Sequence, residues 1–251
     1  MGDPVLHERI VALLAPRAGA GVVDLGCGRA ATLGRLAGRV GPGRAVGVEL
    51  RREPLAAARA RLAESEAPDA RLVRADLAAP LPFRDGAFDG AVCHNVLECL
   101  AAPGRLLEEI ARVLRPGGRL VLGHADFDTL VWSGGDLALE RRIVRCFCDT
   151  QQYWMAHADG TIGRKLPGYV AASPLVPAAV EVHVTVDRTW APGAPGHDFA
   201  HDAAGIARGA GGFPEEELAA WLADLAACAA HGAFFFSLNT VLVVAEKPAA
   251  R

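Results

Sequence analysis

Hydrophobic and polar positions alternate in blocks through the first half of the chain, and each block has the length of a strand or a helix. The apolar runs of strand length lie near residues 21–25, 45–49, 71–75, 88–93 and 119–123. The stretches with helical spacing lie near residues 5–15, 30–40, 53–64 and 103–114. Strands that alternate with helices form a parallel sheet covered on both faces, so this half predicts an α/β fold.

The alternation changes after Gly123. Residues 124–178 gather aromatic and charged side chains, and the pattern between Leu137 and Trp154 is mostly helical. Strand alternation returns at 180–186, a helix begins near Pro214, and the last strand lies at about 234–244. We therefore expect a single domain over residues 1–251, with a helical lid inserted at about 124–178.

Composition narrows the class of protein. The 251 residues are 51% hydrophobic, enough for one globular α/β domain, and the net charge of −3 offers no basic surface for nucleic acid. The apolar stretch at 233–245 is too short and interrupted to cross a bilayer, and the N-terminus does not resemble a signal peptide. The six cysteines form no C-x-x-C pair. We expect a cytoplasmic protein with reduced thiols, no metal, and neither nucleic acid nor membrane as partner.

The candidate chemistry begins at residues 22–30, which read VVDLGCGRA and predict a strand, a tight turn and a helix start. Gly26 and Gly28 let the backbone approach a ligand closely, because they carry no Cβ. Together with Ala31 they also fit the dinucleotide pattern G-x-G-x-x-A. Asp24 would repel a pyrophosphate but attract a ligand with an ammonium and a sulfonium, which favours S-adenosylmethionine.

Residues 24–28, DLGCG, resemble the first motif of the class I S-adenosylmethionine-dependent methyltransferases. The segments that follow in the family's order are GVE at 47–49, VRADL at 73–77, FDGAV at 88–92, HNVLE at 94–98 and LRPGGRL at 114–120. Together they cover roughly residues 20–125. The resemblance implies a Rossmann-like seven-stranded sheet, mostly parallel, with helices on both faces. Its last strand would be antiparallel, between the fifth and the sixth.

The resemblance also implies roles for residues at the strand ends. Glu49 would hold the ribose hydroxyls, Asp76 would meet the adenine amine, and the loop at Asn95 would pass near the methionine moiety. Independently of the family, ligands of open parallel sheets bind beyond the carboxyl ends of the strands. The expected cofactor-binding residues are Asp24, Gly26, Cys27, Gly28, Glu49, Leu50, Asp76, Leu77, Asn95 and Val96.

The acceptor side is expected in and around the lid. Residues 125–129, 162–166 and 235–237 are similar to a small-molecule branch that includes ubiquinone- and menaquinone-type methyltransferases. The candidate catalytic residues are His124, His157 and Tyr153, and the candidate substrate residues are Asp126, Trp132, Trp154 and Arg164. His124 is the first choice as base, because it directly follows the fifth strand and would reach the same rim as Asn95. An ordinary imidazole titrates near pH ~6.5, so it can accept a proton at neutral pH.

The function we expect is methyl transfer from S-adenosylmethionine to a small-molecule acceptor, with natural-product metabolism as one setting. A cyclase or other non-methylating enzyme that uses the same cofactor is the first alternative. An NAD(P)-dependent oxidoreductase is less favoured, since Tyr153 and Lys165 are twelve positions apart instead of the four of a Tyr-x-x-x-Lys pair. A non-catalytic binding module is a further alternative. The acceptor atom stays open, as does the choice between monomer and homodimer.

Overall fold

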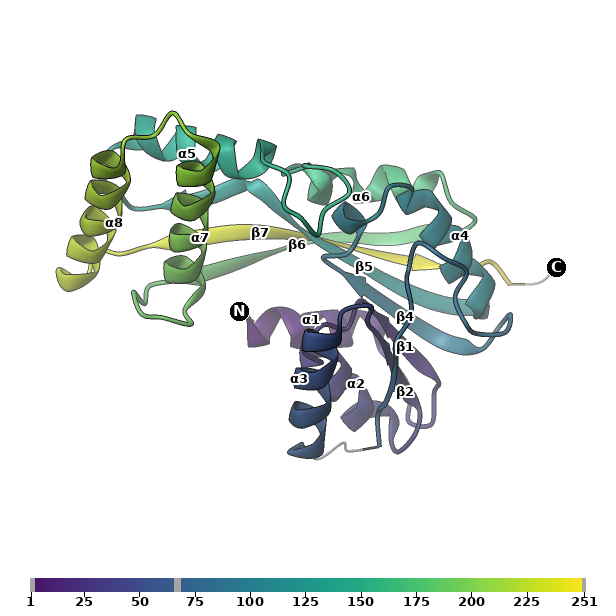
Figure 1. Ribbon diagram of the computed structural model, residues 1–251. Helices are drawn as coiled ribbons and strands as arrows, with labels where there is room; N and C mark the ends of the chain where they lie inside the picture. The colour runs from purple at the N-terminus through teal and green to yellow at the C-terminus, as the bar shows by residue number, and fades with distance from the viewer. Residues whose placement is uncertain (1–2, 66–68, 250–251) are drawn as a thin grey trace.

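The computed structural model describes residues 3–65 and 69–249, and within these ranges one seven-stranded sheet forms the centre of the molecule (Figure 1). The strand order is β3-β2-β1-β4-β5-β7-β6. The strands are β1 (Val22–Leu25), β2 (Ala45–Val48), β3 (Arg71–Val73), β4 (Phe88–His94), β5 (Leu114–Trp132), β6 (Val176–Asp187) and β7 (Phe236–Glu246).

Strand directions follow the expectation drawn from the sequence. The pairings from β3 through β5 are parallel, whereas β7 runs antiparallel to both of its neighbours, β5 and β6. The last strand in sequence therefore lies between the fifth and the sixth. The predicted Rossmann-like sheet, with its reversed last strand, is confirmed.

Helices cover both faces of this sheet. Apolar residues of α1 (Pro4–Leu14), α2 (Ala31–Val40) and α3 (Arg52–Ala63) share one hydrophobic cluster with Val22 and Val92 of the sheet. Residues of α4 (Pro103–Val113) and α6 (Ile162–Ala171) share another with Val23 and Ala91, which point to the opposite face. A short 3₁₀ helix, η1 (Leu97–Cys99), follows β4. The layers are thus helix, sheet, helix.

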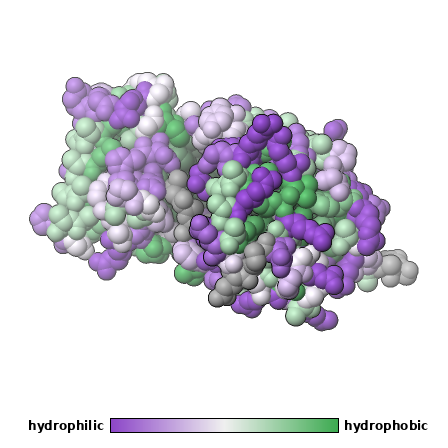
Figure 2. Space-filling view, turned by 60° about the horizontal axis from the view of Figure 1, so that its bottom comes forward, coloured by the Kyte–Doolittle hydropathy of each residue, from purple (hydrophilic) through white to green (hydrophobic). Residues whose placement is uncertain are grey.

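The strands β5, β6 and β7 extend past the other four and carry a second group of helices at their far end (Figure 1). This group consists of α5 (Leu137–Asp149), α7 (Pro195–Ala210) and α8 (Glu215–Ala230). Their apolar residues form a third cluster with the ends of β5 and β7. In the space-filling view, hydrophobic residues are exposed between hydrophilic ones on the face shown (Figure 2).

The inserted segment begins later than the sequence indicated. We expected the fifth strand to end near residue 123 and the lid to follow, but β5 continues to Trp132, where it pairs with Phe236 of β7. Helix begins at Leu137, as the pattern of the sequence indicated, and α6 ends at Ala171. The polar residues at 124, 126 and 128 interrupt the apolar pattern of this part of the strand, although Asp126 is buried and binds Arg164 of α6. Within the described residues, no helix is long and apolar enough to cross a membrane.

Candidate active site

The turn after β1 can be made only with glycine at its first position. Gly26 has a φ of +74°, and a Cβ added to it would lie 2.3 Å from Cγ2 of Val96. The backbone N–H groups of Gly26 and Cys27 donate to the carbonyl of Val48 at 2.8 and 2.9 Å, which fastens the turn to β2. The predicted turn thus meets the loop after β4 in van der Waals contact.

Asp24, the third residue of β1, is a buried carboxyl group with only 3% of its surface exposed. Burial raises its pKa to about 7, and the nearby charge of Glu49 adds to this effect. Because a cationic ligand would supply the missing opposite charge, this environment fits the ammonium of S-adenosylmethionine. An anionic pyrophosphate would instead repel the ionised carboxylate.

Two more acids follow the next strands of the sheet. Glu49, directly after β2, accepts hydrogen bonds from the N–H of Gly28 at 3.2 Å and of Arg51 at 2.8 Å. Asp76 follows β3 and accepts from the N–H of Ala78 at 2.9 Å. With Asp24, the structure places a carboxylate at or just beyond the carboxyl end of three neighbouring strands. This arrangement can hold the hydroxyl and amine groups of a nucleoside.

The apolar residues expected around the nucleoside differ in exposure. Leu50 is 45% exposed, so its side chain offers a surface to a flat ring, whereas Leu77 is buried. Cys27 is also buried, and burial raises the pKa of its thiol far above the usual value. This cysteine is therefore an uncharged neighbour of the site and is unsuited to act as a nucleophile.

The loop after β4 is held in a strained conformation. Asn95 has a φ of +53°, its side-chain oxygen accepts from the N–H of Ala125 at 2.9 Å, and its own N–H donates to Gly123. These two bonds tie the loop to β5 and place Val96 over Gly26. The two predicted cofactor segments are therefore brought together by the fold.

A cavity of about 430 Å³ opens between this turn and α1. Its lining includes Asp24, Gly26, Cys27, His7 and His94. His94 has a buried Nε2 without a hydrogen-bond partner in the described residues, and burial lowers its pKa to about 3. His7 reaches the cavity from α1 and contacts the hydroxyl of Thr32 at 2.8 Å. Sequence reasoning had no signal for His7, because α1 carries only an ordinary apolar stripe.

His124 is completely buried, on the other side of the sheet from this cavity's helices. Its Nδ1 donates to the carbonyl of Ala125 at 2.9 Å, and its Nε2 lies 3.8 Å from Oε2 of Glu98. Burial lowers the pKa of His124 to about 4 and raises that of Glu98 to about 7. An imidazole with no exposed surface cannot touch an acceptor directly, whereas Glu98, on η1, is 8% exposed. Glu98 is a candidate that sequence reasoning missed.

Asp126 and Arg164 are brought together, but by binding each other. The guanidinium of Arg164 donates to the two carboxylate oxygens of Asp126 at 2.7 and 2.6 Å, and it also lies 3.2 Å from Asp128. The structure places this pair where α6 begins, against β5. Gly163 makes the approach possible, because a Cβ there would lie 2.9 Å from the carbonyl oxygen of His124.

The aromatic residues expected along the substrate wall fall into two places. Trp132 is buried, and its Nε1 donates to the carbonyl of Gly196 at 2.8 Å, within the cluster of α7 and α8. Tyr153 and Trp154 are 86% and 40% exposed, and their ring centroids are 4.7 Å apart. Trp132 thus packs in a hydrophobic core, while the other two lie on the surface of the insertion.

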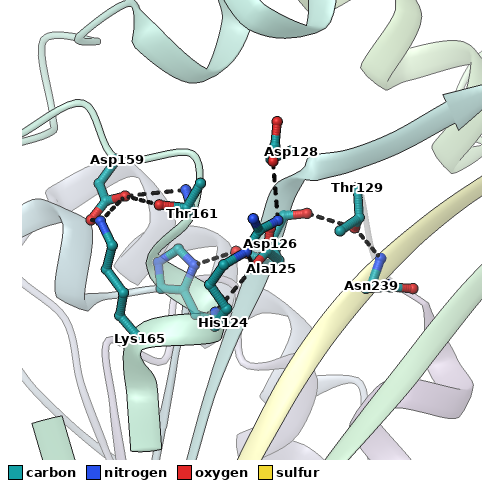
Figure 3. A network of polar contacts seen from close by, with 10 residues as sticks. His124, Ala125, Asp126, Asp128, Thr129, Asp159, Thr161, Lys165 and Asn239 are labelled. Atoms are coloured by element: carbon teal, nitrogen blue, oxygen red, sulfur yellow. Dashed lines mark hydrogen bonds and ion pairs between the residues drawn. The ribbon is translucent and has the colours of Figure 1, made fainter. Parts of the chain in front are cut away.

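Residues 150–161, which we call the lid segment, connect α5 to α6 and lie against η1. The N–H groups of Ala156 and His157 donate to the carbonyl of Glu98. At the end of the segment, Asp159 accepts from Thr161 and from the amine of Lys165, as Figure 3 shows. The lid segment is therefore held at its middle and near its C-terminal end, and it carries His157 and the two exposed aromatic residues. Within the described residues, no three metal-binding side chains come close enough to hold an ion.

Comparison with known proteins agrees with this geometry. Residues 23–122 match the family described as a methyltransferase domain. An uncharacterized 37.1 kDa protein in transposon Tn4556 of Streptomyces fradiae is 34% identical over 238 residues, which is 92% of this chain and 63% of that protein. The demethylmenaquinone methyltransferase of Symbiobacterium thermophilum is 34% identical over 116 residues, 46% of each chain. This chain thus spans less than two thirds of either relative.

Solved structures share the fold over almost the whole chain. The YcgJ protein of Bacillus subtilis has a TM-score of 0.64 at 17% identity, covering 97% of this chain and 98% of that one. The [4+2]-cyclase SpnF has a TM-score of 0.60 at 19% identity, covering 98% and 81%. At such low identity these likenesses show the architecture alone.

Proposed function

We propose that this chain, whose residues 23–122 match a methyltransferase domain, is a class I S-adenosylmethionine-dependent methyltransferase that transfers the methyl group to a small-molecule acceptor. The observation that carries the proposal is the buried, raised-pKa carboxyl of Asp24 beside a turn that requires glycine. A carboxyl in this environment gains most from a cationic ligand.

The residues around the turn would each bind a different part of the cofactor. Asp24 would receive the ammonium, Glu49 the ribose hydroxyls and Asp76 the adenine amine. Leu50 and Leu77 would flank the ring, and the backbone of Gly26, Cys27 and Gly28 would line the approach. Asn95 and Val96 would close the site from the loop after β4. The bound cofactor supplies a methyl group on a sulfonium, which is the electrophile of the reaction.

The protein's part in methyl transfer is mainly positioning. Nucleophile, methyl carbon and sulfur must be in line, and holding them so lowers the entropic part of the barrier. The pair formed by Asp126 and Arg164 would set the place of α6, and thereby of the lid segment. Tyr153, Trp154 and His157 would form the wall that faces the acceptor and keeps water out. Trp132 would support this arrangement from the core.

A proton acceptor is needed only if the acceptor group is protonated before transfer. We assign this role to Glu98, with His124 as the positioning residue behind it, because Glu98 is the member of the pair that has exposed surface. The Nδ1–H bond of His124 to Ala125 fixes the tautomer with its lone pair on Nε2, toward Glu98. His157 and Tyr153, both in the lid segment, are the remaining groups of the wall that can exchange a proton.

The small-molecule class of the acceptor rests on the relatives and on charge. The 27-O-demethylrifamycin SV methyltransferase of Amycolatopsis mediterranei is 30% identical over 118 residues, 47% of this chain and 43% of that protein. The net charge of −3 also disfavours a polyanionic partner. We therefore expect no binding to nucleic acid at ~150 mM salt.

The test separates cofactor binding from methyl transfer. Isothermal calorimetry should show that S-adenosylhomocysteine binds and that NADH does not. Asp24→Ala should weaken the binding of S-adenosylhomocysteine, whereas Glu53→Ala, which replaces an exposed acid on α3, should not. Incubation with S-adenosylmethionine labelled in its methyl group, over a panel of quinols, phenols and macrolides, should give a labelled organic product. Cofactor binding with conversion of an acceptor that gains no label would favour the cyclase alternative, and NADH binding would contradict the site.

A further inference from the structure

The strand β6 ends the sheet, and among the described residues its outer edge pairs with no other strand. On one face it presents a row of valines, each between 49% and 55% exposed. These are Val176, Val180, Val182, Val184 and Val186. We call the last four the valine row. A long apolar edge strand is a surface on which another strand readily pairs.

The opposite face of β6 is already occupied. Glu181 accepts from Arg9 of α1 at 2.9 Å, and Nε2 of His183 lies 2.8 Å from the carboxylate of Asp3. Thr185 donates to the same carboxylate at 2.8 Å. The polar residues of the strand therefore bind within their own chain, and the valine row is left without a cover.

Natural proteins protect such edges with proline, lysine, bulges or short strands. In β6 these devices occur only at the beginning, where Pro177 stands and the register shifts before Ala179. From residue 179 to 187 the pairing with β7 is regular, and the sequence AVEVHVTVD holds neither proline nor lysine. Nine consecutive residues thus keep a regular, open edge.

We propose that a second copy of this chain covers the edge, and that the two β6 strands pair antiparallel about a two-fold axis at Val182. An axis perpendicular to the sheet keeps the valine row of both copies on one side. Val180 then lies opposite the partner's Val184, and Val182 lies opposite the partner's Val182. Such β-branched cross-strand pairs stabilise a sheet.

Charge selects this register over its neighbour. With the axis at Val182, the carboxylate of Glu181 lies opposite the partner's His183, and Arg9 comes near the partner's Asp3. With the axis at His183, two imidazoles would face each other instead. The first arrangement brings the guanidinium of Arg9 toward the carboxylate of the partner's Asp3, a pair of opposite charges across the interface, which favours it.

The interface is small, because a single strand buries less than the about 1,600 Å² of a standard complex. We therefore expect dimerisation in the micromolar range. Sedimentation equilibrium should show the 26.2 kDa mass at about 1 μM and twice that mass at about 100 μM. Val182→Lys, which sets two ammonium groups against each other at the axis, should stay monomeric. Leu137→Lys, on an equally exposed apolar residue of α5, should dimerise as the wild type does.

Disulfide trapping tests the register. In Val182→Cys the two thiols face each other at the distance of a directly opposed pair, so mild oxidation should link two chains. Val186 belongs to the same row and has similar exposure, but in Val186→Cys the two thiols would be separated by about 26 Å. This variant should therefore form no more disulfide-linked dimer than the native protein does. Thermal melts by circular dichroism verify that each variant is folded.

A wild type that remains monomeric at about 100 μM would overturn the proposal. So would a dimer that Val182→Lys leaves intact, or equal trapping through residues 182 and 186. None of these measurements depends on the cofactor or the acceptor, so the proposed activity stands or falls separately.

Discussion

Arg164 of α6 surrounds the carboxylate of Asp126 on β5, with two guanidinium bonds of 2.7 and 2.6 Å and a backbone N–H at 3.0 Å. The carboxylate is buried, while the guanidinium is 48% exposed. The two residues are 38 positions apart in sequence, and their contact decides where the segment between α5 and α6 ends. The insertion is thus fastened to the sheet by an ion pair rather than by apolar packing alone.

Removing the guanidinium should loosen α6. In Arg164→Gln, Asp126 keeps a buried charge without its partner, so we expect the free energy of unfolding to fall by about 1–3 kcal/mol. This is less than the usual cost of breaking a buried ion pair, because Arg164 is half exposed. Urea unfolding measures this loss, and hydrogen exchange of residues 159–171 should accelerate. Arg145→Gln, which breaks the exposed pair with Asp149, is the control and should change little. Equal effects of the two variants would contradict the anchoring role.

The turn after β1 should not tolerate a methyl group. Gly26→Ala combines a positive φ with a Cβ 2.3 Å from Val96, so we expect a loss of about 1–3 kcal/mol in stability and weaker binding of S-adenosylhomocysteine. Gly38→Ala, within α2 and with open space around it, should be neutral or stabilising. Thermal melts and calorimetry on both variants test the contrast; a Gly26→Ala protein with native affinity would show that the turn can adapt.

Asp24→Asn should stabilise the ligand-free protein while weakening cofactor binding. The pKa of Asp24 is raised to about 7 in the folded chain, so the folded state holds its proton more tightly than the unfolded state does. This contribution to stability is present at low pH and is lost as pH rises from about 4 to about 7. The Tm advantage of Asp24→Asn over wild type should therefore grow through this window. His94 and His124 have lowered pKa values and act in the opposite direction, but they are common to both proteins and cancel in the difference.

An advantage of Asp24→Asn that does not depend on pH would contradict a buried, titrating carboxyl. Calorimetry with S-adenosylhomocysteine should give the opposite order at pH 8, since the ionised carboxylate of the wild type is the better partner for an ammonium. Asp24→Asn should lose about 1.5–3 kcal/mol of binding free energy, the range for the loss of a charge-assisted hydrogen bond.

Trp132, at the end of β5, and Trp154, in the lid segment, should separate stability from acceptor binding. Trp132→Ala empties a buried site against Trp221 and Phe236 and should cost about 3–5 kcal/mol in unfolding free energy. Trp154→Ala removes a partly exposed ring and should leave stability and S-adenosylhomocysteine affinity nearly unchanged while raising the KM for the acceptor. Tyr153→Phe should behave like the second variant. If Trp154→Ala instead lost affinity for S-adenosylhomocysteine, the lid segment would contact the cofactor rather than the acceptor.

Glu98 should control the acidic limb of the pH–rate profile if the acceptor gives up a proton. The carboxylate forms above its pKa of about 7, so the rate should rise with pH through that value. Glu98→Gln should lower kcat about 10²–10⁴-fold and abolish the limb, with cofactor affinity retained. His124→Gln should shift the limb rather than abolish it, because the imidazole acts through Glu98. Glu108→Gln, an exposed acid on α4, is the control; an unchanged limb in Glu98→Gln would leave positioning as the whole mechanism.

The sheet could be predicted from the sequence, and so could the edge of the sheet at which we propose that the cofactor binds. Strand–turn–helix patterns are local: Asp24 lies within the first strand, Glu49 directly follows the second, and Asp76 lies three residues after the third. Because parallel strands end at one edge, Asp24, Glu49 and Asp76 had to approach one another once the sheet formed. The last strand, residues 236–246, could also be predicted to within a few residues, because its apolar run is continuous apart from a few polar positions.

Tertiary structure alone decided which side chains of the second half are buried and what they bind. His124, Asp126 and Trp132 lie on one strand, and the sequence indicates chemistry for all three. Whether such a group faces a ligand or the interior depends on elements that arrive from far along the chain: η1 beside His124, α6 over Asp126, α7 over Trp132. Burial and ion pairing are sums over these distant contacts, so no local pattern of residues contains them.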